Sequence, residues 1–385
     1  MLPVLFSEDI VYFNKTYFNR LKNNDVILVK KNHHYFTHRI IYKIKSYLIT
    51  KGDNNLLSDG KIYPSQVIAK AIKIKRQGKT INIEDLYLFQ STLYFQEVVK
   101  IKKALEKENV DFVFLKGLPL HLFFESSHPK RIYADCDVLV DKKDFDKAEK
   151  ILLTFGYKKV RNDLSPTQGK LKNKEIEASF LKIINGIPVV FDIHIEPVFL
   201  MIQLGSLDAL YPQKLIDQLT SEFIKTKQQI IINHERFSIL NTKYLILYLA
   251  LHFFHHNFRG AFRLDFLDTV IRKSHLKKQD WIDIKTTIND YYLENYIGPV
   301  FFLLKKYYST SVPDFINFKS FINYKNLNIF DDESRLEAGV NRFKNIFFLS
   351  PRPLIIRVFV FFNPQVIYLV FFALKKKLSY FLSKH

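Results

Sequence analysis

ADCDVLV, at residues 134–140, is the stretch of sequence that decides the fold of this 385-residue chain. It predicts a short buried strand that carries Asp135 and Asp137 two positions apart. Side chains at i and i+2 on a strand point to the same face, so these two carboxylates can hold the same ligand. The preceding segment, DFVFLKGLPLHLFFE at residues 111–125, predicts a strand that ends at Gly117 and a helix that follows it. Strand, glycine, helix and strand in this order indicate a mixed α/β domain.

A third aspartate lies on a hairpin further along the chain. Two β-type runs, EASFLKII at residues 177–184 and IPVVFDIHI at residues 187–195, are joined by Asn185-Gly186. Both turn residues accept the positive φ that a two-residue hairpin requires. Asp192 lies on the second run. If this strand neighbours ADCDVLV in the sheet, its carboxylate joins the aspartate pair.

We predict an α+β protein with three domains. Residues 1–80 contain short β-type runs separated by turn signals, which predicts a small antiparallel β-domain. Residues 81–206 begin with a helix and continue with alternating strands and helices, which predicts a mixed α/β domain. Residues 207–385 are mostly amphipathic helix, which implies a helical domain packed onto the sheet.

Charge is the unusual feature of the composition. There are 58 Lys and Arg against 38 Asp and Glu, a net charge of +20, which favours anionic partners such as nucleotides, nucleic acid or phospholipid head groups. A composition bias that places Lys on solvated faces is an equally good explanation. A hydrophobic fraction of 48% argues against a disordered chain and against a polytopic membrane protein. The single cysteine, Cys136, excludes an intramolecular disulfide framework and favours a reducing compartment.

The carboxyl end is apolar and basic. Residues 1–10 contain no secretory signal, so we expect a cytoplasmic protein. Residues 341–385 carry eight Lys and Arg and no Asp or Glu. Residues 354–374 are mostly apolar, but polar residues at their centre argue against a membrane-spanning helix. One interpretation is core helices; the other is an interfacial helix that makes a peripheral contact with the inner face of the membrane through residues 354–377.

Three clustered carboxylates indicate a metal site. They repel one another unless a cation neutralises them, and carboxylate oxygens are ligands that Mg²⁺ prefers. We therefore predict that Asp135, Asp137 and Asp192 bind Mg²⁺ and form the catalytic centre. The third of them, Asp192, can also act as a general base towards an acceptor hydroxyl.

The residues before the aspartate pair suit a triphosphate. Gly117 lacks a side chain, which lets backbone N–H groups approach phosphate oxygens. Lys116 and Arg131 can add positive charge, the arginine in a bidentate manner. We predict that these three residues bind the nucleotide.

Residues 112–197 resemble the minimal nucleotidyltransferases of the DNA polymerase beta-like superfamily, and among them an uncharacterised nucleotidyltransferase family. That family has the pattern Leu-Lys-Gly, Arg, Asp-x-Asp-x-Leu-Val and Asp-x-His, followed by a helical signature of two His, Arg-Leu and Asp. Here these stand at Leu115-Lys116-Gly117, Arg131, Asp135 to Val140, Asp192 to His194, His252, His256, Arg263-Leu264 and Asp268. Leu118 stands where the wider superfamily commonly has Ser. The resemblance extends over residues 85–385.

Three histidines need separate interpretations. His252 and His256 share a helical face, which would suit a transition metal, but no carboxylate at a fixed spacing accompanies them. A structural or substrate-facing role is the better interpretation of this pair. For His194 we predict contact with the carboxylates rather than catalysis.

Residues 1–78 are similar to the signal peptidase I and LexA-like serine peptidase fold, in particular its archaeal and endoplasmic reticulum branch. The resemblance rests on DVILV at residues 25–29, THRI at residues 37–40 and TKGDNN at residues 50–55. It implies that His38 corresponds to the base and Asp53 to the acid that orients it. Met1 stands immediately after the position of the nucleophilic Ser. The domain is therefore either a vestigial, peptide-binding β-module or a peptidase whose Ser lies upstream.

The favoured function is a Mg²⁺-dependent nucleotidyltransferase that moves a nucleoside monophosphate from an NTP to a hydroxyl of a small molecule, peptide or protein. A serine peptidase of the signal peptidase type is the alternative. A basic, non-catalytic scaffold is a third possibility. No recognition helix or aromatic–basic platform is visible, so we predict no sequence-specific nucleic-acid binding.

Overall fold

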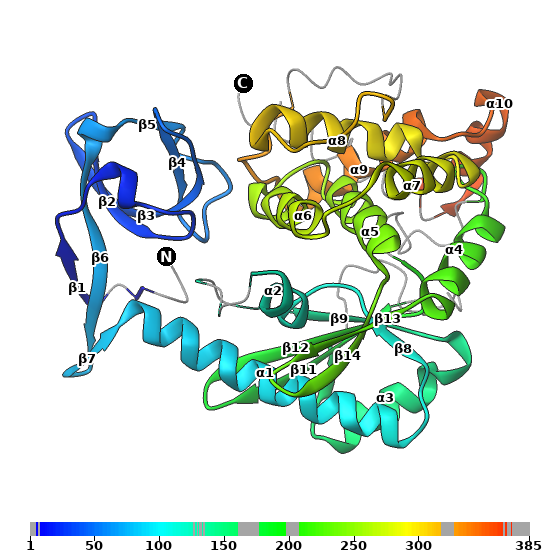
Figure 1. Ribbon diagram of the computed structural model, residues 1–385, viewed down its shortest axis with the longest axis horizontal. Helices are drawn as coiled ribbons and strands as arrows, with labels where there is room; N and C mark the ends of the chain where they lie inside the picture. The colour runs from blue at the N-terminus through cyan, green and yellow to red at the C-terminus, as the bar shows by residue number, and fades with distance from the viewer. Residues whose placement is uncertain are drawn as a thin grey trace.

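The computed structural model describes residues 5–371, apart from residues 7, 126–127, 129, 131–132, 134, 161–176, 198–207, 317–326, 365 and 368–370. An amino-terminal β-domain lies beside a second sheet that carries helices on its faces, and a helical region stands above this second sheet in Figure 1. The predicted α+β class is confirmed.

Seven strands form the β-domain, at the left of Figure 1. Their order is β1-β6-β2-β3-β4-β5, with β7 paired to β6, and neighbouring strands are antiparallel. A small apolar core inside the domain includes Ile27, Ile40 and Leu48. The strands are β1 (Ile10–Asn14), β2 (Val26–Lys31), β3 (His34–Lys43), β4 (Leu48–Lys51), β5 (Lys61–Ile62), β6 (Val67–Arg76) and β7 (Lys79–Asn82).

The β-domain continues directly into a long helix, α1 (Ile83–Lys107). Glu84 and Asp85 lie in its first turn, where negative charge favours the helix dipole. Its buried face, which includes Val98 and Ile101, packs against the second sheet as part of the main core. The strand before α1 reaches two residues beyond the predicted domain boundary at residue 80.

The second sheet is mixed, in the order β10-β11-β12-β9-β8-β14-β13. The strand at its centre, β9, is parallel to β12 and antiparallel to β8. Both β8 and β9 are almost entirely buried, as expected of strands that are covered on both faces, although β9 also carries Asp135 and Asp137. The elements of this region are β8 (Phe112–Phe114), α2 (Leu118–Glu125), β9 (Asp135–Val140), α3 (Phe145–Thr154), β10 (Lys158–Val160), β11 (Glu177–Ile184) and β12 (Ile187–His194).

The predicted β11–β12 hairpin is present. Its turn residues Asn185 and Gly186 have φ values of 49° and 78°, which is the left-handed conformation that their residue types accept. The two strands of the hairpin pair antiparallel over their whole length, and β12 also pairs parallel with β9. In this alignment Asp192 is the register partner of Asp137. The sheet thus brings together carboxylates that are 55 positions apart in the sequence.

A second hairpin was not predicted. Within the region that we assigned to helices, β13 (Gln228–Ile232) and β14 (Glu235–Ile239) complete the mixed sheet, and β14 runs parallel to β8. The alternation of buried Ile230 and Ile232 with more exposed residues is the pattern of a half-buried strand. The region that we assigned to helices therefore also contributes two strands to the sheet, between α4 (Gln213–Lys225) and α5 (Thr242–His255).

The helical region is built around α5, whose side chains are nearly all apolar and buried. A single core of buried apolar side chains extends from the mixed sheet into these helices. No helix within the described ranges is long and apolar enough to cross a membrane. The region contains α4 (Gln213–Lys225), α5 (Thr242–His255), α6 (Ala261–Lys273), α7 (Lys278–Asp290), α8 (Glu294–Tyr308), α9 (Arg335–Leu349), α10 (Leu354–Arg357) and a 3₁₀ segment, η6 (Val358–Phe362).

Polar contacts join the β-domain to the helical region. The hydroxyl of Tyr42 donates a hydrogen bond of 2.8 Å to the carbonyl of Tyr307. The hydroxyl of Ser58 donates one of 2.7 Å to Asp331, and Lys51 pairs with Asp332. The β-domain is therefore docked on the rest of the chain as well as linked to it through α1.

Candidate active site

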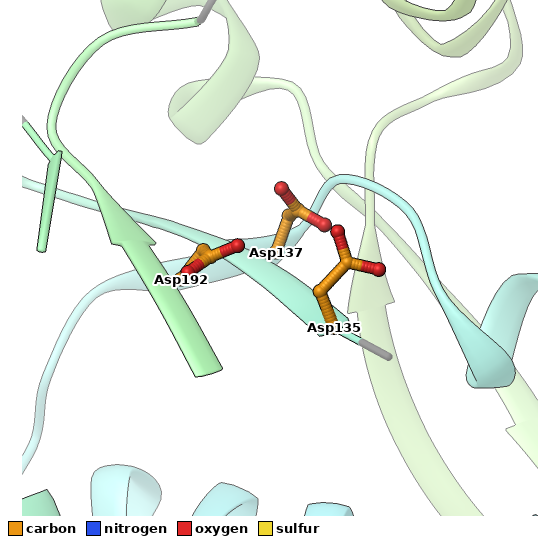
Figure 2. Close-up of side chains that lie close together, drawn as sticks. All are labelled: Asp135, Asp137 and Asp192. Atoms are coloured by element: carbon orange, nitrogen blue, oxygen red, sulfur yellow. The ribbon is translucent and has the colours of Figure 1, made fainter. Parts of the chain in front are cut away.

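Three carboxylates converge at one end of the mixed sheet, as predicted. Asp135 and Asp137 lie on the same face of β9, and Asp192 reaches them from the adjacent strand β12 (Figure 2). One oxygen from each carboxylate lies within 4.8 Å of the others. Asp137 is buried, whereas Asp135 and Asp192 are partly exposed. The group is thus open on one side and embedded in the sheet on the other.

Lys116 lies between the first two carboxylates. Its Nζ is 2.9 Å from Asp135 Oδ2 and 2.9 Å from Asp137 Oδ2. Burial alone would lower the pKa of this lysine, but the two aspartates outweigh burial and raise it, so the side chain stays charged. A cation therefore already occupies the space between two of the three carboxylates.

Gly117 turns the chain away from the sheet immediately after this lysine. Its φ is +107°, a backbone conformation that residues with a side chain rarely adopt. A Cβ atom would lie 3.5 Å from the carbonyl oxygen of Asp135, an ordinary contact distance, so the backbone conformation is what requires glycine. The glycine lets the chain turn from β8 into α2 close beside the carboxylates.

His194 fixes the most deeply buried carboxylate. Its Nε2 lies 3.0 Å from Asp137 Oδ1, and both residues are buried. Burial would raise the pKa of Asp137, but Lys116 and this hydrogen bond hold it below its usual value. Asp137 is therefore ionised and held in place, and the predicted contact of His194 with the carboxylates is present.

Asp192 is the carboxylate whose negative charge is least balanced by neighbouring cations and hydrogen-bond donors. Its Oδ1 is buried and has no hydrogen-bond partner among the described residues. Burial, together with the negative charge of Asp137, raises its pKa to about 7. A buried, unsatisfied oxygen that faces two other carboxylates is the feature expected when a cation is required to complete a site.

The donor set fits a hard divalent cation. All three side chains offer oxygen, which suits Mg²⁺ and disfavours thiolate- or imidazole-seeking metals. Within the described ranges this is the one group of three or more His, Cys, Asp or Glu residues with ligand atoms close enough to share an ion. His252 and His256 are not part of such a group.

The paired histidines lie instead in the helical layer that covers the site. The rings of His252 and His256 are 4.7 Å apart, and His252 also stacks near Tyr248 at 6.0 Å. Burial first, and then the positive charges of Lys116 and Arg263, lower the pKa of His252 well below its usual value. A neutral, buried histidine near Lys116 agrees with a structural or substrate-facing role. The signature residue Asp268 is structural, because it accepts a hydrogen bond of 2.5 Å from Thr310 and pairs with Arg272.

Sequence reasoning missed a residue that positions the segment before β9. The buried amide of Gln90, on α1, accepts a hydrogen bond from the backbone N–H of Tyr133 and donates one to its carbonyl, at 3.2 and 2.9 Å. A glutamine on a helix carries no signal that would reveal this contact. The predicted nucleotide ligand Arg131 lies outside the described residues.

In the β-domain, His38 pairs with an aspartate other than the predicted Asp53. His38 Nδ1 is 2.7 Å from Asp59 Oδ2, and the hydroxyl of Thr50 donates a hydrogen bond of 2.7 Å to the same oxygen. Asp53 instead forms two hydrogen bonds of 2.8 Å with Arg39. The assignment of Asp53 as the acid that orients His38 is therefore wrong, because Arg39 takes both of its oxygens.

Two comparisons with known proteins found a match. Residues 83–309, more than half of the chain, match a family described as uncharacterised nucleotidyltransferase. A solved structure with detectable similarity is the crystal structure of an antigenic nucleotidyltransferase-like protein from Paracoccidioides brasiliensis. The two chains are 11% identical with a TM-score of 0.32, over 60% of this chain and 94% of the other. No curated protein matches the chain.

Proposed function

The chain belongs to the uncharacterised nucleotidyltransferase family, and we propose that it transfers a nucleoside monophosphate from an NTP to a hydroxyl group with the help of Mg²⁺. The observation that carries the proposal is the convergence of three carboxylates, among which Asp192 has a buried oxygen without a hydrogen-bond partner in the described part of the chain. The acceptor would be a small molecule, a peptide or a protein.

The proposed reaction assigns separate tasks to the side chains. Asp135, Asp137 and Asp192 would hold Mg²⁺, which when bound neutralises phosphate oxygens and aligns them for displacement. The acceptor oxygen attacks the α-phosphorus. The bond between this phosphorus and the oxygen that bridges it to the β-phosphate breaks, and pyrophosphate leaves. The proton of the attacking hydroxyl passes to the carboxylate of Asp192, whose pKa is raised in the metal-free chain, as suits a group that must take up a proton near neutral pH.

The chain also offers groups that orient the triphosphate. Lys116 is charged and lies beside the carboxylates, and the backbone at Gly117 passes close to the site. Arg131 is proposed as a further phosphate ligand on the strength of its sequence position alone. The His252 and His256 pair covers the site with neutral rings and adds no competing charge.

The test uses NTPs labelled at the α-phosphate. We expect Mg²⁺-dependent release of pyrophosphate and transfer of the label to an acceptor from a cell extract. The double variant Asp135→Asn/Asp137→Asn should abolish both signals and should also lose Mg²⁺-dependent NTP binding in calorimetry. Asp146→Asn, an exposed change in the first turn of α3, is the matched control and should behave as the unaltered protein. Label transfer that continues in the double variant would contradict the proposal.

A second candidate function is favoured by the pairing of His38 with Asp59. A histidine whose Nδ1 is held by a carboxylate is arranged as a general base, and serine peptidases use such a pair to activate a hydroxyl. This activity also requires a nucleophilic side chain beside His38, and no serine or threonine hydroxyl forms a hydrogen bond with His38 among the described residues. Reading the codon directly upstream of Met1 is the cheapest test: an in-frame Ser codon supports a peptidase, and a stop codon argues against it.

A further inference from the structure

One arginine of the helical region is enclosed without a partner. Arg342 lies on α9, one of the helices that stand above the mixed sheet in Figure 1. Its Nε is buried, and its guanidinium forms no hydrogen bond or ion pair with any residue in the described part of the chain. Arg39 and Arg76, by contrast, are paired with Asp53 and Asp9. A guanidinium offers several N–H donors, so an enclosed one is unfavourable unless a ligand supplies acceptors.

The carboxylate that acts most strongly on Arg342 is bound elsewhere. Burial lowers the pKa of Arg342 to about 10, although the negative charge of Glu333 acts in the opposite direction. Glu333 Oε1 accepts a hydrogen bond of 2.7 Å from Asn341 and lies 3.4 Å from Nη2 of Arg259. Its Oε2 accepts a hydrogen bond of 2.7 Å from Asn257. Arg342 therefore stays positively charged at neutral pH, and no carboxylate of a described residue binds it.

Glu177 relates this arginine to the face of the sheet that carries the carboxylates. Apart from burial and Glu333, the charge of Glu177 also raises the pKa of Arg342, so the two side chains lie near each other although they form no ion pair. Glu177 is the register partner of His194 on β12, and directly paired residues project to the same face of a sheet. Asp192 lies two positions before His194 and shares that face. Arg342 thus faces the carboxylate side of the sheet, beside β11.

This place is on the acceptor side of the proposed reaction. The strands run in the order β11-β12-β9-β8, and the three clustered carboxylates lie on the two middle strands. Lys116 and Gly117, the proposed triphosphate ligands, follow β8 at one side of them. Arg342 lies near β11 at the other side, next to the strand that carries Asp192, the proposed base for the acceptor hydroxyl. A nucleotide bound at Lys116 leaves the side of β11 to the acceptor.

We propose that Arg342 binds an anionic group of the acceptor, so that the acceptor is a hydroxyl compound that also carries a phosphate or a carboxylate. A planar guanidinium binds either group through two parallel hydrogen bonds. The inference rests on the proposed function for the identity of the ligand as the acceptor, and it narrows the chemical class of that acceptor.

The first test measures anion binding without NTP or metal. Thermal unfolding of the full chain is followed in chloride, in inorganic phosphate and in acetate, at equal ionic strength. We expect phosphate or acetate to raise the unfolding temperature of the unaltered protein, because a ligand of the folded state stabilises it, and we expect Arg342→Met to lose this rise. The matched control is Lys344→Met, which removes an exposed cation from the same helix and should keep the rise. The anion that is effective identifies the acceptor group as a phosphate or a carboxylate.

The second test measures transfer of the α-phosphate label to an acceptor fraction of a cell extract. Arg342→Met should need about 10- to 100-fold more of this fraction for half-maximal transfer, the loss expected for hydrogen bonds to a charged group, while the KM for NTP stays unchanged. Arg342→Lys keeps the charge and should recover part of the loss. Urea unfolding should show no loss of stability in Arg342→Met, because the variant removes an enclosed charge that has no partner.

Several results would overturn the proposal. Neither anion could stabilise the unaltered protein, or Arg342→Met could retain the effect. A raised KM for NTP with an unchanged requirement for the acceptor fraction would assign Arg342 to the nucleotide instead. If the unaltered protein transfers no label at all, the proposed function fails, and the anion measurement then decides by itself whether Arg342 binds a phosphate or a carboxylate.

Discussion

The carboxylates of the mixed sheet and those of the β-domain differ in how completely their charge is balanced. In the β-domain, Asp53 has both oxygens bound by Arg39, and Asp59 accepts hydrogen bonds from two side chains. In the mixed sheet, one lysine pairs with two of the three carboxylates, and Asp192 keeps a buried oxygen that has no partner in the described part of the chain. A balanced pair stabilises a fold, whereas an unbalanced cluster requires a ligand.

The largest effect is expected at the unbalanced carboxylate. Asp192→Asn keeps the shape of the side chain but removes its charge and its capacity to accept a proton. We expect turnover to fall about 100- to 10,000-fold, the range typical of a lost general base. In the unaltered enzyme, kcat/KM should rise with pH until about 7, because the free enzyme must lose the proton from Asp192 before it can act as a base.

Steady-state kinetics across pH 5 to about 9 would check this prediction, with Asp146→Asn as a control for the loss of one acidic charge. A variant that retains full turnover, or a profile that is flat through neutral pH, would show that Asp192 does not take the proton.

A stability effect of similar size is expected at the balanced pair. Arg39 is buried and also donates to the hydroxyl of Tyr87 on α1, so it ties the β-domain to the helix that follows. Arg39→Met should lower the free energy of unfolding by about 3 kcal/mol, because it leaves the Asp53 carboxylate without its partner.

Urea unfolding of Arg39→Met, Asp53→Leu and the double variant forms a cycle that isolates the pair. We expect the double variant to be more stable than the sum of the single losses predicts. Strict additivity of the two losses would mean that the ion pair contributes nothing to stability.

The elements of the carboxylate site could be predicted because each follows from local pattern. Asp135 and Asp137 share a face by strand periodicity, and Asn185-Gly186 defines the hairpin that carries Asp192. That β12 lies beside β9 was a prediction about pairing between distant segments, and the register of Asp192 with Asp137 confirms it.

Contacts between distant side chains could not be predicted in the same way. Both Asp53 and Asp59 follow the strand that pairs with β3, so the sequence alone does not decide which of them meets His38. The β13–β14 hairpin was missed because its short apolar runs are surrounded by helical sequence, although Ile230 and Ile232 have the spacing of a strand. The role of Gln90 depends on the close approach of α1 to Tyr133, which no local pattern encodes.

A smaller effect of the unbalanced cluster concerns stability and pH. The folded-state pKa of Asp192 is about 7, above its value in the unfolded chain, so the folded state binds more protons between about pH 4 and 7. Asp192 therefore favours folding at low pH, and this contribution is lost as the pH rises through about 7. In EDTA, the free energy of unfolding of the unaltered protein should fall by about 2 kcal/mol between pH 5 and 8, relative to that of Asp192→Asn. The partial exposure of Asp192 makes this change smaller than its pKa alone would give. Equal pH dependence of the two proteins in urea unfolding would contradict this sign.

The smallest effect is expected at the cation that partly balances the cluster. Lys116 Nζ lies 2.9 Å from both Asp135 and Asp137 and therefore competes with a metal for the same oxygens. Lys116→Met removes this competitor and leaves the three carboxylates with stronger mutual repulsion. In the absence of nucleotide, the variant should bind Mn²⁺ about tenfold more tightly, a gain of about 1.4 kcal/mol, as measured by electron paramagnetic resonance of free Mn²⁺.

The matched control for this last change is Lys182→Met, which removes a lysine of β11 that pairs with Glu97 of helix α1. It should leave Mn²⁺ affinity unchanged, because Glu97 is not one of the clustered carboxylates. Weaker Mn²⁺ binding by Lys116→Met would mean that the lysine organises the carboxylates for the metal. Tighter binding would instead mean that Lys116 holds the metal's place between Asp135 and Asp137 when no nucleotide is bound.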